Sequence, residues 1–216
     1  LIYDNYKDNP QRIVDRLINL KIDRKIGVDI LGEGEPKIPH PSDDTWNGIS
    51  LPWMAFGYGV SLTPLQQLTF YNAVANNGEM VKPSFINSIG SIGEKPIYQI
   101  DREIIMPSIS SRETLKSVKK MLLNVVEKPW GTANNIYDKD LKIAGKTGTA
   151  QVDYTKDETQ YISSFVGYFP ADDPKYSSIV VIHKPKKSEG YYGNTVAAPV
   201  FKKVAKKIMN NIPIEI

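Results

Sequence analysis

The stretch AGKTGTAQ, from Ala144 to Gln151, decides how the second half of this sequence folds. A lysine between glycines and threonines suits either a loop that holds phosphate or a strand that lines a site for attack on a carbonyl. A nucleotide-binding loop needs a glycine five residues before the Gly-Lys-Thr, because its backbone amides must curl around the phosphates. Asp140 occupies that position, and its carboxylate would repel phosphate. The sequence therefore favours the strand.

Alternation along such a strand predicts Thr147 and Thr149 on one side, with Lys146 and Gly148 on the other. Hydroxyls and an ammonium group can bind a carboxylate, and glycine lets another group approach the backbone closely. The edge of the strand could also pair with an extended peptide. On these four residues alone, a glycine-containing strand that merely bends or bulges is the alternative.

Two further stretches predict strands beside this one. KIAGKTGTAQVDY, YISSFVGYFPA and YSSIVVIHKP each alternate with a period near two. A charged turn around Lys156 to Glu158 and the turn ADDPK join them, and such short connections favour an antiparallel meander. The expected fold class is α+β, an antiparallel sheet flanked by helices.

Helices are predicted in the first half of the chain. One runs from about Pro10 to Leu20 with Asn9 as its cap. Another follows Thr63, which acts as the cap, with Gln66 completing a capping box and Gly78 ending the helix. Between them, the glycines and prolines of residues 32–48 predict a long exposed loop.

Two amphipathic helices are predicted in the second half. The first, about Arg112 to Glu127, is expected to be capped by Ser110. The second closes the chain in APVFKKVAKKIMNN. It could cover the sheet, lie on a membrane or bind acidic partners, and a helix that covers the sheet is the preferred interpretation. Its expected inner face is Val200, Phe201, Val204, Ile208 and Met209, and its expected solvated face is Lys202, Lys203, Lys206 and Lys207.

Composition narrows the class of protein. Hydrophobic residues make up 41% and charged residues 24% of the 216, which is typical of a globular chain. The 27 Lys and Arg against 24 Asp and Glu are too evenly balanced to predict nucleic-acid binding. The absence of cysteine excludes disulfides and cysteine-ligated metals, and no apolar run is long enough to predict a membrane span.

Several stretches, in order, resemble one family. They are FGYGVSLTPLQQLTFYNAVANNGEMVKP (residues 56–83), GTA (131–133), the KTGT of the opening stretch, FVGYFPA (165–171) and YYGNTVAAPVF (191–201). Together they resemble the transpeptidase domains of penicillin-binding proteins, and most closely the monofunctional, class B, division-type members. The resemblance covers the chain from about residue 50 to its end.

The resemblance implies a serine acyl-enzyme mechanism that cross-links peptidoglycan stem peptides ending in D-Ala-D-Ala and that β-lactams trap. It implies that Lys146 attracts the substrate carboxylate and that Thr147 and Thr149 bind it. Gly148 would keep the approach open, and the backbone N–H of Thr149 would donate to the oxyanion, a contact worth about 3 kcal/mol. It implies no cofactor or metal, partners in division or cell-wall synthesis, and an extracytoplasmic location with an N-terminal membrane anchor.

The family also needs a Ser-x-x-Lys and a Ser-x-Asn earlier in the chain. Ser117 to Lys120 matches the first pattern, but it falls out of order on the polar face of a predicted helix. No Ser-x-Asn occurs, and Tyr3-Asp4-Asn5 is interpreted as coincidence. Residues 1–216 are thus expected to be the C-terminal part of one transpeptidase domain, with its nucleophile upstream of Leu1 and an exposed sheet edge or helix face that could favour dimers.

Two alternatives stay open at this stage. A β-lactamase, carboxypeptidase or β-lactam sensor also presents a Lys-Thr-Gly strand, and the lifetime of its acyl-enzyme with penicillin would separate these classes. A non-catalytic binding module would lack the serine altogether, and the upstream sequence would decide that.

Overall fold

The computed structural model describes residues 1–152 and 159–211, which form two compact units. The first unit holds residues 1–70 and 79–109, and the second holds residues 71–78 and those from 110 onward. The predicted turn at 156–158 lies outside the described residues.

The first unit contains mostly helices and loops. Its helices are α1 (Ile2–Tyr6), α2 (Gln11–Asn19), α3 (Ser50–Met54) and the first part of α4 (Pro64–Ala75). Helix α2 confirms the predicted helix, although its N-cap is Pro10 and not Asn9, and no side chain caps it. The predicted loop at residues 32–48 is irregular, and an isolated bridge joins Lys37 to Ser61.

The start of α4 is fixed by the capping box that the sequence predicts. The Thr63 N–H donates to Gln66 Oε1 at 2.8 Å, and the Gln66 N–H donates to Thr63 Oγ1 at 3.1 Å. These bonds satisfy two backbone donors that helix geometry leaves unpaired. At the other end Gly78 has a φ of 98°, and its N–H donates to Ala73 O at 2.7 Å, which ends the helix as predicted.

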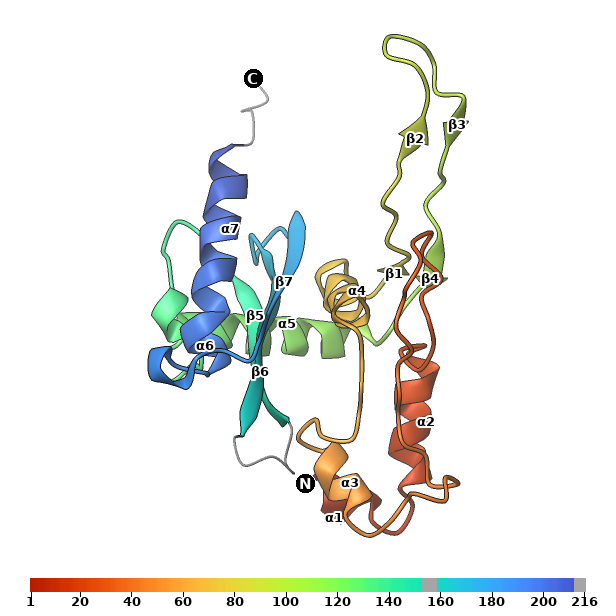
Figure 1. Ribbon diagram of the computed structural model, residues 1–216, viewed down its shortest axis with the longest axis vertical. Coiled ribbons are helices and arrows are strands. Elements are labelled where there is room, and N and C mark those ends of the chain that lie inside the picture. The colour runs from red at the N-terminus through yellow and green to blue at the C-terminus, as the bar shows by residue number, and fades with distance from the viewer. Residues whose placement is uncertain (153–158, 212–216) are drawn as a thin grey trace. The chain divides into compact units, whose positions relative to one another are not determined.

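Four short strands after α4 are not anticipated by the sequence. Strand β1 (Met80–Val81) pairs with β4 (Ile104–Met106), and β2 (Ser88–Ile89) pairs with β3 (Tyr98–Gln99), both antiparallel. Figure 1 shows β2 and β3 as the arms of a long extended hairpin. Its isoleucines are exposed, so no buried face imposes an alternating pattern on the sequence.

The second unit is built on the predicted antiparallel meander. Strands β5 (Ala144–Val152), β6 (Gln160–Phe169) and β7 (Tyr176–His183) pair in the order β5-β6-β7. Helix α5 (Arg112–Glu127) precedes them, and its cap is Ser111, whose hydroxyl accepts the Thr114 N–H at 3.2 Å. The prediction of Ser110 as the cap is therefore wrong by one residue. The α+β class is confirmed.

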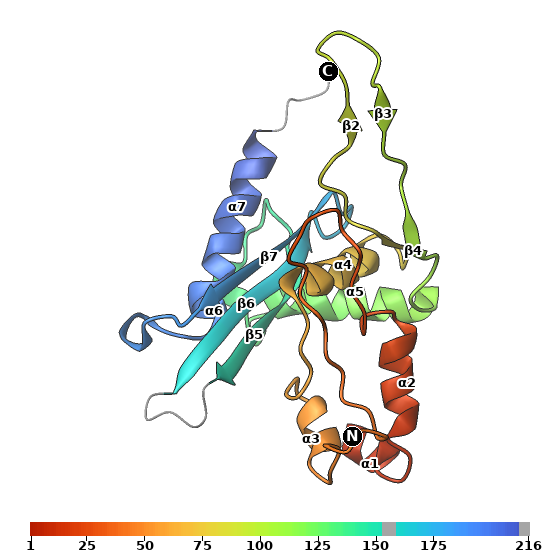
Figure 2. The ribbon, with the colours of Figure 1, turned by 45° about the vertical axis from the view of Figure 1, so that its right-hand side comes forward.

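Short helical segments connect and close this unit. They are the 3-10 turns η1 (Asn134–Ile136) and η2 (Lys187–Glu189), helix α6 (Gly193–Val196) and the longer α7 (Ala198–Asn210). Figures 1 and 2 both show α7 running beside the three-stranded sheet, where it contacts β6 and β7. The closing helix thus covers the sheet, as the preferred interpretation of its sequence predicts.

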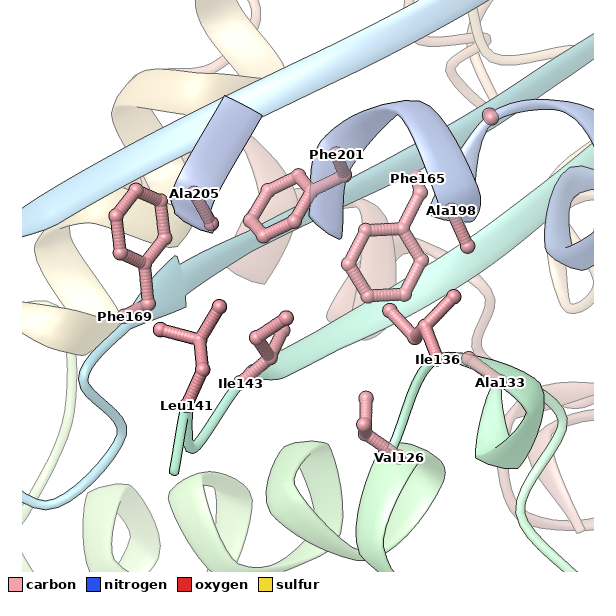
Figure 3. Packing of buried hydrophobic residues seen from close by; sticks show 11 residues of the cluster. Val126, Ala133, Ile136, Leu141, Ile143, Phe165, Phe169, Ala198, Phe201 and Ala205 are labelled. Carbon is pink, nitrogen blue, oxygen red and sulfur yellow. The ribbon is translucent and has the colours of Figure 1, made fainter. Parts of the chain in front are cut away.

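The core of the second unit lies between the sheet and α7. Phe165, Phe169 and Phe201 are fully buried, and the Phe201 ring meets the other two edge to face at centroid distances of 4.8 and 5.7 Å (Figure 3). Aromatic pairs favour this geometry. The other buried members are Val126, Ala133, Ile136, Leu141, Ile143, Ala197, Ala198 and Ala205.

The inner face of α7 differs from the predicted one at the two valines, whereas Phe201 is buried and Ile208 and Met209 pack against the core as predicted. Val200 and Val204 are 41% and 39% exposed, whereas Ala198 and Ala205 are buried beside Phe201. The stripe is therefore rotated toward small residues, which let the helix approach the sheet closely. The prediction of the two valines as inner residues is wrong because the size of a side chain, and not its hydrophobicity alone, decides which face of the helix packs against the sheet.

Two of the four lysines on α7 hold the helix in place. Lys206 Nζ lies 2.6 Å and Lys202 Nζ 3.3 Å from Asp138 Oδ2, and Lys202 also donates to Tyr137 O at 2.9 Å. The hydrogen bond from Lys206, followed by that from the Asp140 N–H, holds the pKa of Asp138 well below its usual range. The prediction that these lysines only face water is wrong for this pair.

Candidate functional site

The predicted site residues all lie on β5, an outer strand of the described sheet. Among the described residues β5 pairs with one strand, β6, and its register sets Lys146 opposite Val166, Gly148 opposite Ser164 and Thr149 opposite Ser163. Strand alternation then places Thr147 and Thr149 on one face, as predicted. The other long edge of β5 is the one that an extended peptide could reach.

The side chain of Lys146 lies against its own strand and contacts the next residue, Thr147. Its Nζ donates to Thr147 O at 2.9 Å and lies 3.4 Å from Thr147 Oγ1. Although the residue as a whole is exposed, burial of the ammonium group by surrounding atoms lowers the pKa of Lys146. A partly desolvated ammonium interacts more strongly with an anion than a fully hydrated one does.

The two threonine hydroxyls each have a neighbour that fixes them. Thr147 Oγ1 lies 3.0 Å from Thr132 Oγ1, a residue in the loop after α5. Thr149 Oγ1 accepts the backbone N–H of Gly193, at the start of α6, at 3.0 Å. The two hydroxyls are therefore held by partners distant in sequence. Thr149 accepts and so keeps its own proton, whereas in the Thr132–Thr147 pair either hydroxyl can be the donor.

The strand has close neighbours at Gly148 on two sides. A Cβ on Gly148 would lie 2.5 Å from Ser164 Oγ on the neighbouring strand. From α6, the backbone at Gly193 comes so close that a Cβ there would lie 2.6 Å from Gly148 O. The backbone at Gly193 thus packs closely against the backbone at Gly148, and the role predicted for Gly148 toward a substrate stays a prediction.

Aromatic side chains flank the strand. Tyr161 on β6 stacks on Tyr191 at a centroid distance of 4.1 Å, and Tyr192 packs against Tyr191 at 4.4 Å. Ser163 donates to the Tyr191 carbonyl, which ties this segment to β6. The tyrosines lead directly into Gly193, so their packing helps to place the N–H that fixes Thr149.

Sequence reasoning did not assign roles to Thr132 or Gly193. Both lie in stretches that resemble the family, GTA and YYGNTVAAPVF, but a resemblance gives no contact. Their partners on β5 are 15 and 44 residues away along the chain. The roles predicted for Lys146, Thr147, Gly148 and Thr149 stay predictions.

The Ser117 to Lys120 pattern does not join this group. Both residues are exposed on α5. The lysine of this helix that makes contacts is Lys119, whose Nζ donates to Ala75 O at 2.9 Å and to Asn77 Oδ1 at 2.8 Å, at the end of α4. Burial lowers the pKa of Lys119. This helix thus uses its lysine for structure.

Solved structures share this fold. Penicillin-binding protein 3 from Mycobacterium tuberculosis, in its apo form, matches with a TM-score of 0.76 and 29% identity over 95% of this chain and 48% of that chain. Penicillin-binding protein 2B from Streptococcus pneumoniae matches with a TM-score of 0.78 at 18% identity over 100% of this chain and 35% of that one, which bears on the fold alone. The fold is that of the penicillin-binding proteins.

Sequence comparison identifies the family. The family model "Penicillin binding protein transpeptidase domain" matches residues 7–206. Stage V sporulation protein D of Bacillus subtilis is 35% identical over 82% of this chain and 27% of its own length, and peptidoglycan D,D-transpeptidase FtsI of Buchnera aphidicola is 29% identical over 91% and 33%. The chain belongs to the penicillin-binding protein transpeptidase family, in its class B. It spans between about a quarter and a third of the length of these relatives.

No helix among the described residues is long and apolar enough to cross a membrane.

Proposed function

We propose that this chain forms one wall of the active site of a peptidoglycan D,D-transpeptidase. The observation that supports this most directly is the pair of threonine hydroxyls on β5, each hydrogen-bonded to a partner distant in sequence. Thr149 keeps its proton for another acceptor, and Thr147 does so when Thr132 is the donor. Beside them lies the ammonium of Lys146. Two hydroxyl donors and an ammonium group on one strand are suited to bind the terminal carboxylate of a D-Ala-D-Ala peptide. β-Lactams mimic this peptide and carry a carboxylate of their own.

The proposed reaction is acyl transfer in two steps. A serine oxygen attacks the carbonyl of the penultimate D-alanine, an ester forms, and the terminal D-alanine leaves with a proton on its nitrogen. An amine of a neighbouring peptide then attacks the ester, an amide forms, and the serine regains its proton. Both steps pass through an oxyanion, which the backbone N–H of Thr149 would stabilise by about 3 kcal/mol.

The serine in this proposal comes from outside these 216 residues. Ser117, the match to Ser-x-x-Lys, is exposed on α5, and the sequence contains no Ser-x-Asn. We therefore assign residues 1–216 to the C-terminal part of one transpeptidase domain. The chain would bind the substrate carboxylate and stabilise the oxyanion, while the remainder of the protein would supply the nucleophile and its base.

Covalent labelling tests this proposal. The whole protein is expected to form a stoichiometric adduct with a fluorescent penicillin, and the 216-residue chain alone is expected to form none. Replacing Thr149 by Val should slow labelling of the whole protein by about tenfold or more, since one hydrogen bond to a charged group is lost. Peptide mapping of an adduct to Ser117 would contradict the assignment.

The lifetime of the adduct decides between the proposed enzyme and its relatives of similar fold. A transpeptidase should keep the penicilloyl ester over many minutes, whereas a β-lactamase should hydrolyse it in seconds. No adduct in the whole protein would favour a non-catalytic binding module.

Location and partners follow from the proposed reaction. Peptidoglycan lies outside the cytoplasmic membrane, so the proposed site faces that side, and the whole protein would be held there by an N-terminal helix. Proteins of division or cell-wall synthesis are its expected partners. Protease accessibility of residues 1–216 from outside intact spheroplasts would test the orientation.

A further inference from the structure

The loop that follows α5 is rigidly attached to the end of that helix. The Ala133 N–H donates to Val125 O at 2.9 Å, and Asn134 Nδ2 donates to Val126 O at 3.1 Å. A Cβ on Gly131 would lie 2.5 Å from Asn124 O, so the backbone here lies against the last turn. These contacts satisfy carbonyls that the helix leaves unpaired, and they fix the backbone on both sides of Thr132.

Thr132 itself takes no part in that cap. Its side chain is exposed, while the buried contacts of the loop are made by Ala133 and Ile136. The hydroxyl instead reaches β5, where Thr132 Oγ1 lies 3.0 Å from Thr147 Oγ1. A surface threonine thus sits on a fixed backbone with its hydroxyl aimed at a predicted substrate-binding group.

The hydrogen-bonding capacity of Thr147 gives this contact a direction. A hydroxyl donates one proton and accepts two. Lys146 can only donate, and its Nζ lies 3.4 Å from Thr147 Oγ1. When Thr147 gives its proton to a bound carboxylate, the bond between the two threonines must run from Thr132 to Thr147. The result is a chain of two hydroxyls that ends on the anion, in which each bond strengthens the next.

Thr149 has the same arrangement with a different donor. The Gly193 N–H donates to Thr149 Oγ1 at 3.0 Å, so that hydroxyl also keeps its proton for another acceptor. When both threonines of β5 donate to a bound carboxylate, each would therefore accept one hydrogen bond from the protein, Thr149 from a backbone amide and Thr147 from a side chain.

We propose that Thr132 is a positioning residue, whose hydroxyl donates to Thr147 and so directs the Thr147 proton toward the carboxylate of the bound peptide or β-lactam. This inference rests on the proposed function. It requires no contact between Thr132 and the substrate.

The first test compares acylation rates of the whole protein by a fluorescent penicillin. Thr132→Val keeps the shape and removes the hydroxyl, and it is expected to lower the second-order rate constant by about 3- to 10-fold. Thr132→Ser keeps the hydroxyl and should stay within about 2-fold. The matched control is Thr114→Val, which removes a similar hydroxyl pair with Ser111 at the opposite end of α5, and it should leave the rate unchanged.

The second test separates positioning from a structural role. In a Thr147→Val background the Thr132→Val change should have no further effect, because its only route to the substrate is gone. With the methyl ester of the same penicillin, which lacks the carboxylate, Thr132→Val and the unsubstituted protein should react at equal rates.

Three results would overturn the inference: an unchanged rate in Thr132→Val, additive losses in the double variant, or equal slowing with the acid and its ester. Failure of the proposed function is read separately, from the unsubstituted protein. If that protein takes no penicillin label, the proposed function fails and the inference fails with it.

Discussion

The β5–β7 sheet and the β2–β3 hairpin are both antiparallel, yet they are stabilised in different ways. In the sheet, one face is closed by α7, and Phe165, Phe169 and Phe201 have no exposed surface. In the hairpin, Ile92 and Ile97 are exposed at 106% and 82%. A strand pair without a covering layer gains little from its apolar residues, since they stay in water. The sheet owes its stability to the helix that lies on it.

The largest expected effect comes from removing the ring that joins the sheet to α7. Phe201→Ala should lower the free energy of unfolding by about 3–5 kcal/mol, since it deletes a fully buried ring that meets two others. Urea unfolding of the whole protein, followed by tyrosine and tryptophan fluorescence, measures it. A loss below about 1 kcal/mol would show that α7 does not support the sheet.

A smaller effect is expected at the loop behind the site. Gly131→Ala places a Cβ 2.5 Å from Asn124 O, a backbone atom that cannot rotate away, and should cost about 1–3 kcal/mol. The matched control is Gly48→Ala in the irregular loop of the first unit, where nothing lies within 4 Å. It should change stability by less than about 0.5 kcal/mol. Equal effects of the two changes would mean that the loop after α5 can move.

A pH-dependent effect is expected at the clamp between Asp138 and α7. Asp138→Asn should lower the midpoint of thermal unfolding at pH 7 by roughly 2–4 °C. Because the pKa of Asp138 is lowered in the folded protein, its stabilising contribution is present above the unfolded-state pKa of about 4 and is lost as the pH falls further. The difference between the unfolding midpoints of the two proteins should therefore be constant above about pH 5 and narrow as the pH falls toward 3. A difference that grows toward acid pH would contradict this clamp.

The smallest effect is expected in the hairpin. Ile92→Ser removes an apolar side chain that is already in water, so stability should change by less than about 0.5 kcal/mol. The midpoint of urea unfolding is the measurement, with Phe201→Ala as the contrasting variant. A loss comparable to that of Phe201→Ala would mean that the two regions are supported alike.

The fold was most predictable from the sequence where a residue's hydrogen-bond partners lie only a few residues away along the chain. The capping box of α4 and its final glycine were correct because their partners lie within a few residues. At α5 two consecutive serines compete for the cap, and propensity does not choose between Ser110 and Ser111. On α7 hydrophobicity alone favours the valines over the alanines, because a sequence pattern carries no distance between helix and sheet.

The candidate site was predictable only in part for a related reason. Alternation gave the faces of Lys146, Thr147 and Thr149 on β5. The groups that fix the two hydroxyls, Thr132 and Gly193, depend on how a loop and a helix end meet the strand, and no local pattern carries that information. The exposed strands β2 and β3 were missed because neither face is buried, so no alternation is imposed on them.

The two hydroxyls of β5 differ in how mutation can reach them. The support of Thr149 is a backbone amide, which no side-chain change removes, and Gly193 tolerates no larger residue because a Cβ would lie 2.6 Å from Gly148 O. Position 193 is therefore fixed as glycine. Thr132 is exposed, and serine, valine and alanine all fit a surface position of this kind. The proposed carboxylate binding can thus be adjusted in small steps through substitutions at Thr132 that act on Thr147, whereas substitutions at position 193 would abolish the support of Thr149.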